Sequence, residues 1–480
     1  MLALTTTVAS AQIPTDSVRS LAAIHRQVVR FGARYGEAIW PGYRPDTIPV
    51  AYVFPKRGTV LLNWHGPLPS GYQSVADLPG AAWLEQQNLG AASTGASLGD
   101  RAVAQVVVSS LAMEDLLPVA FHEAFHVFEH ASRRPGRRFG TGENSFYVSS
   151  YPVFGVNNEM LWTLEGKLLS AALREKTASR RRELARQFVA VRRNRQSQLE
   201  PSYAEFEVAS EMNEGLAEYA LVRALQLLAS DPRVSATTRA GATTKLPRRL
   251  ADVEHLTENV RQSFRLRFYQ TGPAEALLLD ALAPGWKKRM MEQNLSLQDA
   301  LAIASGIDDA QQAALRMAVT KLDTTTMSRE SARRVAGVIE LRRRQVDSVL
   351  AAPGVLLELS ASALPNKDFG NCGFDPQNHL QISPTVQMQT RWWRPCAGPA
   401  LTSEFNVPSV HDDETGTVRA VIGRSEDVTL TIDGKPVALT DGLLLDDATN
   451  VRIAAPRATV QSARARVVVQ GRALRVTPLP

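Results

Sequence analysis

Two histidines and a glutamate have a spacing that suits a metal ion used for hydrolysis. Residues 122–126 read His-Glu-Ala-Phe-His within Leu116–Phe128, an apolar run with helical spacing. On a helix, His122 and His126 lie one turn apart on the same face, so both imidazoles can reach one zinc ion. The carboxylate of Glu123 is then close to a water on that ion and can act as its general base. The spacing therefore predicts a hydrolytic zinc centre.

A catalytic zinc site needs a third protein ligand and keeps a fourth position for water. His130 continues the four-residue spacing, but it lies about 6 Å beyond His126 along the same helix, so we expect it to lie away from the ion. Glu214, on a second predicted helix 88 residues after His126, is the better third ligand. Glu218 follows by one turn and is suited to accept an N–H from a ligand imidazole. The alternative, in which both glutamates face water, stays open.

The two motifs together resemble those of the gluzincin metallopeptidases. In that family a second helix carries N-E-G-x-A, whose glutamate is the third zinc ligand, and residues 213–219 read NEGLAEY here. Residues 268–274, FYQTGPA, are similar to the Tyr-x-x-Gly-Ala stretch of the aminopeptidase branch. The resemblance implies that Tyr269 stabilises the oxyanion of the tetrahedral intermediate; a packing role for this tyrosine is the alternative. The resemblance covers about residues 100–300, and the two zinc helices lie further apart in sequence than in the aminopeptidase branch.

The resemblance implies a mainly helical, zincin-like catalytic domain that hydrolyses peptide bonds with Zn²⁺. Glu123 would take the proton of the attacking water and deliver it to the leaving amine. The family also has an edge strand directly before the zinc helix, and Ala102–Ser109 occupies that place. An extended peptide can pair with such a strand.

The elements that position these residues follow from hydrophobic periodicity. We expect a loop over residues 66–100, which are rich in Gly, Ser, Pro and Ala. Strands are predicted at Pro49–Phe54, Thr59–Trp64 and Ala102–Ser109. Helices are predicted at Ser17–Arg34, Pro118–Ala131, about Asn157–Gln198, Tyr203–Ala229 and, with interruptions, on to about residue 350.

Near Pro353 the helical pattern gives way to short alternating runs such as Val428–Ile432, Val451–Ala454 and Ala465–Val469. We therefore predict an α+β protein: a mainly helical catalytic domain with a small N-terminal β-sheet, followed by a β-rich C-terminal module. The expected division is a truncated signal peptide at 1–11, the N-terminal helix and sheet of the catalytic unit at 12–100, the zinc-binding helical domain at 101–352, and the β-rich module at 353–480.

Composition and charge exclude several classes of protein. The 480 residues are 44% hydrophobic and 21% charged, which is typical of a globular protein. Charge does not indicate a nucleic-acid partner, because the formal net charge of +6 is small for this length. No apolar run is long enough to span a membrane. The basic segment Arg174–Arg195 carries apolar residues at helical spacing and is interpreted as a solvated helix face, with a polyanion site as the alternative.

The N-terminus and the two cysteines favour export to the periplasm or the medium. Residues 1–11 place Ala9 and Ala11 as a signal-peptidase site, although their apolar segment is short, they lack basic residues, and they also suit an ordinary terminus. Cys372 and Cys396 stand 24 residues apart in a loop-rich stretch, which suits one disulfide in an oxidising compartment. Two free buried thiols are the alternative.

We therefore expect a zinc metallopeptidase acting on a peptide or protein substrate, with no nucleic-acid partner and no membrane span. The alternative is a non-catalytic zincin-fold binding or scaffold protein at the cell envelope, in which Trp392 and Trp393 form an aromatic contact surface. Core packing explains these tryptophans equally well. Cleavage specificity and oligomeric state cannot be predicted from the sequence.

Overall fold

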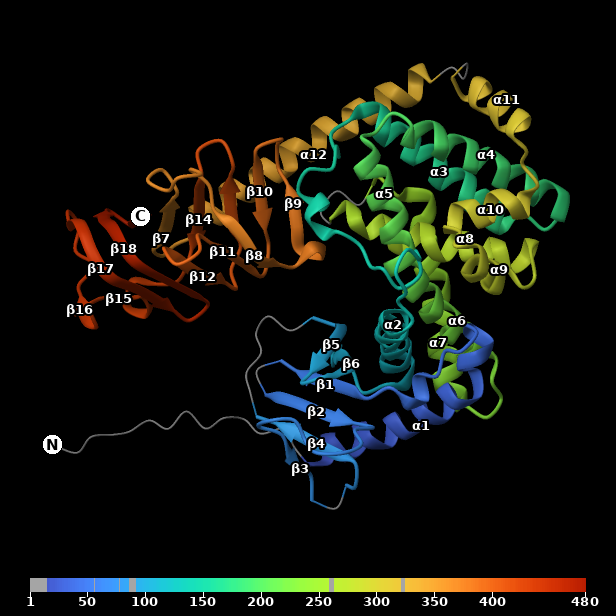
Figure 1. Cartoon of the computed structure of the whole chain (residues 1–480), viewed down its shortest axis with the longest axis horizontal. Coiled ribbons are helices and arrows are strands. Elements are labelled where there is room, and N and C mark those ends of the chain that lie inside the picture. Colours follow the sequence, from blue (N-terminus) through green and yellow to red (C-terminus); the bar gives the residue numbers. More distant parts are fainter. Residues whose placement is uncertain (1–14, 56, 77, 86–91, 259–262, 321–323) are drawn as a thin grey trace. The chain divides into compact units, whose positions relative to one another are not determined.

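The computed structural model describes residues 15–480 except 56, 77, 86–91, 259–262 and 321–323. The proposed signal peptide, residues 1–11, lies outside the described residues. Contacts within the chain divide it into two compact units. The first contains residues up to Asn144, Trp162–Leu256 and Arg267–Leu322, and the second contains Ser145–Leu161, Thr257–Leu266 and Asp323–Pro480. Both contain helices, and both sheets are largely antiparallel, so the predicted α+β class is confirmed (Figure 1).

The first unit contains a six-stranded sheet in the order β3-β4-β2-β1-β6-β5, in which only the β1–β6 pair is parallel. Its strands are β1 Val50–Phe54, β2 Gly58–Leu62, β3 Gln73–Ser74, β4 Ala81–Leu84, β5 Thr94–Leu98 and β6 Arg101–Val107. The loop expected over residues 66–100 is wrong, because β3, β4 and β5 lie there. Their Ala, Ser and Gly residues have little intrinsic strand preference, and pairing with neighbouring strands holds them in the sheet.

The edge strand beside the metal-motif helix is β5, not the strand predicted at Ala102–Ser109. That segment forms β6, which pairs with β1 on one side and with β5 on the other. A Cβ placed on Gly95 of β5 would lie 3.2 Å from the Cβ of His126, so β5 passes directly against this helix. The absence of a side chain at Gly95 permits this close approach.

Ten further helices or helical segments build the first unit around the motif helix α2, Met113–Ala131. They are α1 Thr15–Ile39, α4 Ala178–Gln196, α5 Pro201–Ser210, the π-helix η3 Glu211–Gly215, α6 Leu216–Ser230, α7 Ala236–Ala251, α8 Phe268–Leu282, α9 Trp286–Gln293, α10 Leu297–Ser305 and α11 Asp309–Thr320. Helix α3, Val156–Arg174, begins in the second unit and continues in the first. Six short 3-10 segments lie at Pro45–Thr47, Ser145–Val148, Asp252–His255, Phe264–Arg267, Pro376–Asn378 and Ser425–Asp427.

The metal-motif helix and the helix predicted after it differ from the expected bounds. Helix α2 begins five residues before Pro118, because a proline this close to a helix start removes few hydrogen bonds. The helix expected over 157–198 is interrupted between Arg174 and Ala178, where Glu175 accepts the backbone N–H of Thr177.

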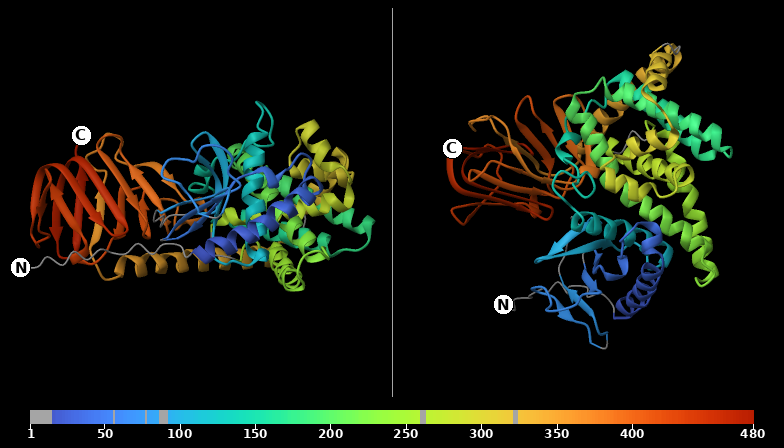
Figure 2. Two further views of the ribbon diagram at one scale, coloured as in Figure 1. Left: turned by 90° about the horizontal axis from the view of Figure 1, so that it is seen from below. Right: turned by 45° about the vertical axis from the view of Figure 1, so that its right-hand side comes forward.

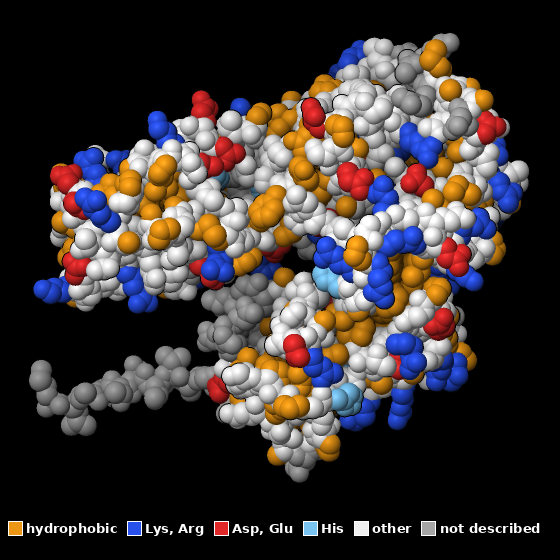
Figure 3. Space-filling view, in the orientation of Figure 1, with side chains coloured by type: hydrophobic (Ala, Val, Ile, Leu, Met, Phe, Trp, Pro, Cys, Tyr) orange, Lys and Arg blue, Asp and Glu red, His pale blue; other side chains and the backbone are white. Residues whose placement is uncertain are grey.

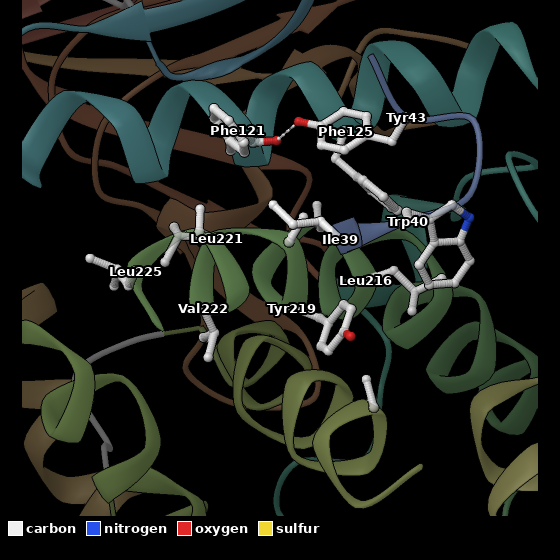
Figure 4. Packing of buried hydrophobic residues seen from close by; sticks show 14 of the residues in the cluster. Ile39, Trp40, Tyr43, Phe121, Phe125, Leu216, Tyr219, Leu221, Val222 and Leu225 are labelled. Atoms are coloured by element: carbon white, nitrogen blue, oxygen red, sulfur yellow. Dashed lines mark hydrogen bonds between the residues drawn. The ribbon is translucent and has the colours of Figure 1, made fainter. Parts of the chain in front are cut away.

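Aromatic packing fixes α2 on a face next to the one that carries its two motif histidines. The indole of Trp40 stacks on Phe139 and meets Phe125 of α2 edge-on. The Tyr43 hydroxyl donates a 2.7 Å hydrogen bond to the backbone carbonyl of Phe121 (Figure 4). Burial raises the pKa of this tyrosine well above its usual range, because it disfavours the phenolate. One face of α2 is thus held in the core.

The second unit consists mainly of a thirteen-stranded β module, defined here as β7–β19, and helix α12, Thr325–Ala351. The boundary expected at residue 353 falls between α12 and β7. The strands are β7 Leu356–Ser360, β8 Gly370–Phe374, β9 His379–Gln381, β10 Val386–Gln389, β11 Trp393–Cys396, β12 Leu401–Phe405, β13 Ser409–Asp412, β14 Thr417–Val421, β15 Thr429–Ile432, β16 Lys435–Val437, β17 Leu444–Ala455, β18 Ala458–Gln470 and β19 Ala473–Pro478.

The β module encloses its own core. The first half of β18 pairs with β12 and its second half with β19, so the sheet turns around buried aliphatic residues. Cys372 of β8 and Cys396 of β11 form a disulfide between paired strands. Trp393 is 3% exposed and packs in this core, so it cannot supply an aromatic contact surface. Helix α12 lies beside the β module (Figure 2). Its Val346 packs against residues of β9, β10 and β13.

Within the described parts of the chain, no helix has the length and apolar character needed to cross a bilayer. On the face visible in Figure 3, basic side chains occur on both units and are interspersed with acidic ones. This mixed surface agrees with the small net charge of the sequence.

Two glycines bring η3 and α8 into backbone contact. A Cβ on Gly272 of α8 would lie 2.3 Å from the Cα of Gly215 of η3, and a Cβ on Gly215 would lie 2.7 Å from the Cα of Gly272. Any side chain at either position must therefore push the two helices apart. These helices carry Glu214 and Tyr269, so the contact also sets how close those side chains lie.

We expect Gly272→Ala to lower the free energy of unfolding by about 1–3 kcal/mol, because the backbones cannot separate without strain elsewhere. Gly337→Ala is the control: it lies on an exposed part of α12, and its new Cβ meets nothing within 4 Å. That control should raise stability by up to about 1 kcal/mol through helix propensity. Denaturant unfolding measures the stability of both variants. A Gly272→Ala protein with the wild-type unfolding midpoint would contradict the close backbone contact.

Candidate metal centre

Helix α2 presents His122, Glu123 and His126 together on its buried face. The two histidines are 6% and 9% exposed, and Glu123 is 5% exposed. Nitrogen atoms of the two imidazoles and a carboxylate oxygen of Glu123 lie within 4.8 Å of one another. A group of side chains that could bind a metal ion is therefore present on this helix, as expected.

Glu214 of η3 completes a triangle of donor atoms. The Nε2 atoms of His122 and His126 are 3.2 Å apart, and Oε2 of Glu214 lies 3.4 Å from the first and 3.3 Å from the second. A tetrahedral ion with bonds of about 2.0–2.1 Å separates its donors by about 3.3 Å. Two imidazoles and a carboxylate at these separations fit a zinc ion and leave a fourth position open.

The π-helix η3 explains how Glu214 reaches this position. A π-turn adds one residue to the helical turn and rotates the side chains that follow. The sequence predicts one continuous helix from Tyr203 to Ala229, but the structure forms α5, η3 and α6 in this range. Asn213 donates a 3.3 Å hydrogen bond to Oε1 of Glu214, so the other carboxylate oxygen faces the histidines.

A second carboxylate stands behind each histidine. Oε2 of Glu218 lies 3.3 Å from Nδ1 of His122, as the one-turn spacing predicts. Oε2 of Glu129 lies 3.5 Å from Nδ1 of His126. Such partners orient a ligand imidazole and keep its Nε2 available for the metal. Glu129 was not predicted, although its position three residues after His126 on the same helix was a usable signal.

Arg249 of α7 is a further residue of the site that was not predicted from the sequence. Its Nη1 donates a 3.1 Å hydrogen bond to Oε1 of Glu218, the carboxylate that faces His122. The guanidinium therefore holds the carboxylate whose other oxygen points to the imidazole. No short-range sequence pattern links this arginine to Glu218, 31 residues earlier.

The carboxylates control protonation at the site. Burial alone would lower the pKa of His122, but Glu214 and Glu218 outweigh burial and raise the pKa to about 9. Burial also opposes protonation of His126, yet Glu214 and Glu129 raise its pKa well above the usual range. Since a metal binds neutral imidazole, metal and protons compete for these nitrogens. Burial raises the pKa of Glu123 itself, as suits a group that accepts and returns a proton.

Tyr269 lies beside the histidines, and His130 does not join them. The ring of Tyr269, near the start of α8, is parallel to the His122 imidazole with 5.8 Å between ring centroids. His130 is exposed at the end of α2. The six residues predicted for the site therefore lie close together, and His130 lies outside this group.

Buried ion pairs hold η3 in place. Arg192 of α4 donates to both carboxylate oxygens of Glu211 in η3, at 2.7 and 2.8 Å. The same guanidinium bonds Glu165 of α3 and Glu275 of α8. Arg195 bonds Glu165 and Glu207 of α5, so α3, α4, α5, η3 and α8 share one buried network.

This network corrects the interpretation of Arg174–Arg195 as a solvated helix face. Arg192 and Arg195 are each 1% exposed, whereas Arg180 and Arg182 face solvent. Their burial is tolerable because four glutamates neutralise them. Burial and the neighbouring Glu211 raise the pKa of Glu275 well above its usual range, while Arg192 opposes this rise.

Comparison with known proteins returned no match: no family model, no curated protein and no solved structure is significantly similar to the chain. The function must therefore be inferred from the geometry of the site.

We expect Glu214→Ala to lose bound zinc, because two imidazoles alone leave the donor triangle incomplete. Wild-type protein loaded with zinc and dialysed should retain about one ion per chain. Glu205→Ala serves as the control, since this exposed glutamate on α5 bonds only Arg138 among the described side chains. Elemental analysis measures the outcome, and full zinc retention in Glu214→Ala would rule out this residue as a ligand.

Proposed function

We propose that the protein is a zinc-dependent peptidase of the gluzincin type. The observation that carries the proposal is the donor triangle of His122, His126 and Glu214, with the buried carboxylate of Glu123 beside it. A metal site that served only to hold the fold would use four protein ligands and would not need an adjacent base. This arrangement supports hydrolysis by water.

Zinc is the proposed ion. Two imidazole nitrogens and one carboxylate oxygen suit zinc, whereas Ca²⁺ and Mg²⁺ prefer shells made of oxygen. When bound, Zn²⁺ supplies Lewis acidity and lowers the pKa of a coordinated water to about 7.

The protein side chains divide the remaining chemistry among them. Glu123 accepts the proton of the attacking water and returns it to the leaving amine. The phenol of Tyr269 donates a hydrogen bond to the negative charge that develops on the carbonyl oxygen in the transition state. Glu218 and Glu129 hold the ligand imidazoles in the tautomer that exposes Nε2.

The edge strand β5 supports a peptide or protein substrate. Its residues Thr94, Gly95 and Ser97 are exposed, and the strand runs against the metal-motif helix at Gly95. An extended peptide pairing with this edge would lie along the site and gain backbone hydrogen bonds. The edge strand proposed to pair with substrate is therefore β5, Thr94–Leu98, and not the strand predicted at residues 102–109.

We also propose that the protein works outside the cytoplasm, in the periplasm or the medium. The Cys372–Cys396 disulfide supports this, because such bonds persist in oxidising compartments. The alternative function, a non-catalytic scaffold at the cell envelope, has less support. Trp393 is buried, and Glu123 sits where a base is needed.

Glu123→Gln should reduce peptide cleavage by about 10²–10⁴-fold, because the amide cannot accept the water proton. Bound zinc should stay unchanged, since Glu123 is not one of the three proposed ligands. Glu114→Gln, in the first turn of the same helix, should keep wild-type activity. The assay is chelator-sensitive digestion of a peptide library, and the proposal fails if Glu123→Gln cleaves at the wild-type rate.

Tyr269→Phe separates an oxyanion role from a packing role. Phenylalanine keeps the ring beside His122 but removes the hydroxyl. We expect kcat to fall by about 10²–10³-fold with little change in KM, because the lost hydrogen bond forms only in the transition state. Steady-state kinetics with zinc content measured in parallel provides the test; an unchanged kcat would leave Tyr269 as a packing residue.

A further inference from the structure

One face of the β module carries two polar rows that cross three neighbouring strands, β19, β7 and β14. The register places Glu358 opposite Arg475 on one side and Arg419 on the other, which makes a row of charges. Two residues further along the strands, Ser360 stands opposite Thr417, with Thr477 on the other neighbour. This second row carries only hydroxyl groups.

The two rows line a hollow of about 480 Å³ in this face, which is within the range of small-molecule sites. Asp412 and Thr415, at the turn between β13 and β14, line one side. One carboxylate oxygen of Asp412 is already used within the turn, because its Oδ1 accepts hydrogen bonds from the backbone N–H groups of Glu414 and Thr415. None of the described side chains that line the hollow is aromatic.

The charges in the hollow are not all paired. Arg475 donates to Glu358 at 2.5 Å and to Gln470 at 3.0 Å. Arg419 stands directly opposite Glu358 but forms no side-chain hydrogen bond or ion pair with any described residue, and its Nε atom is buried without an acceptor. A buried guanidinium nitrogen without an acceptor costs free energy that a bound anion recovers.

We propose that this hollow is a binding site for an acidic carbohydrate, with a sugar carboxylate on Arg419 and sugar hydroxyls on the Ser360, Thr417 and Thr477 row. A guanidinium matches the two oxygens of a carboxylate, and each side-chain hydroxyl both donates and accepts. A neutral sugar would lack the ionic contact and would find no aromatic ring on which to stack. The site belongs to the β module alone and does not depend on the proposed peptidase activity.

The test is isothermal titration of the full chain with trigalacturonic acid, and with maltotriose as the neutral counterpart. We expect saturable binding of the acidic trisaccharide and none of the neutral one. Arg419→Gln should raise the Kd for trigalacturonic acid at least ~10-fold, because it removes the charge-assisted contact. Arg424→Gln is the matched control: among the described side chains it pairs with Glu426 at 3.9 Å, it is highly exposed, and it does not line the hollow.

Thr417→Val provides a second variant, because valine keeps the branched shape and strand preference while removing one hydroxyl of the row. This variant should also bind trigalacturonic acid more weakly than the wild type. It tests the site even if Arg419→Gln does not fold. Three results would overturn the proposal: no saturable binding of trigalacturonic acid, equal binding of maltotriose, or an unchanged Kd in the folded Arg419 or Thr417 variant. Tighter binding of inorganic phosphate or of a short peptide would also overturn it, by assigning the hollow to another anion.

Discussion

The placement of one carboxylate, that of Glu214, is the constraint on which the first unit depends. Its Oε2 lies 3.3–3.4 Å from two imidazole nitrogens on another helix. The backbone around Glu214 forms a π-turn in place of a regular α-helical turn. Arg192 anchors that turn through Glu211 and cannot be buried without its acidic partners. The ion network in the core therefore serves the geometry of the candidate metal centre.

Both sides of the site are held by structure outside the donor triangle. On one side, Tyr43 bonds the backbone of α2 and the aromatic core packs behind it. On the other, Gly215 and Gly272 allow η3 and α8 to meet backbone to backbone. Behind the histidines, carboxylates raise the imidazole pKa values, and Arg249 holds one of those carboxylates from α7. A buried cation would compensate this concentration of negative charge.

In the β module, successive side chains along a strand face opposite sides of the sheet. Leu357 and Leu359 of β7 point into its core, whereas Glu358 and Ser360 between and after them face the hollow. Because side chains on neighbouring strands line up in register, alternation along each strand becomes rows across the sheet. One sheet therefore supplies both an aliphatic core and a polar surface with the unpaired guanidinium of Arg419.

The sequence by itself determined the α+β class and the helix face that joins His122 and His126, because both follow from periods of two and of about 3.6 residues. It also indicated Glu214, through a motif resemblance. Only the tertiary structure decided that Arg249 bonds Glu218, that Arg192 is buried, and that β5 rather than β6 forms the edge. Periodicity says which residues share a face, but not which element packs against that face, and all three outcomes depend on contacts between elements.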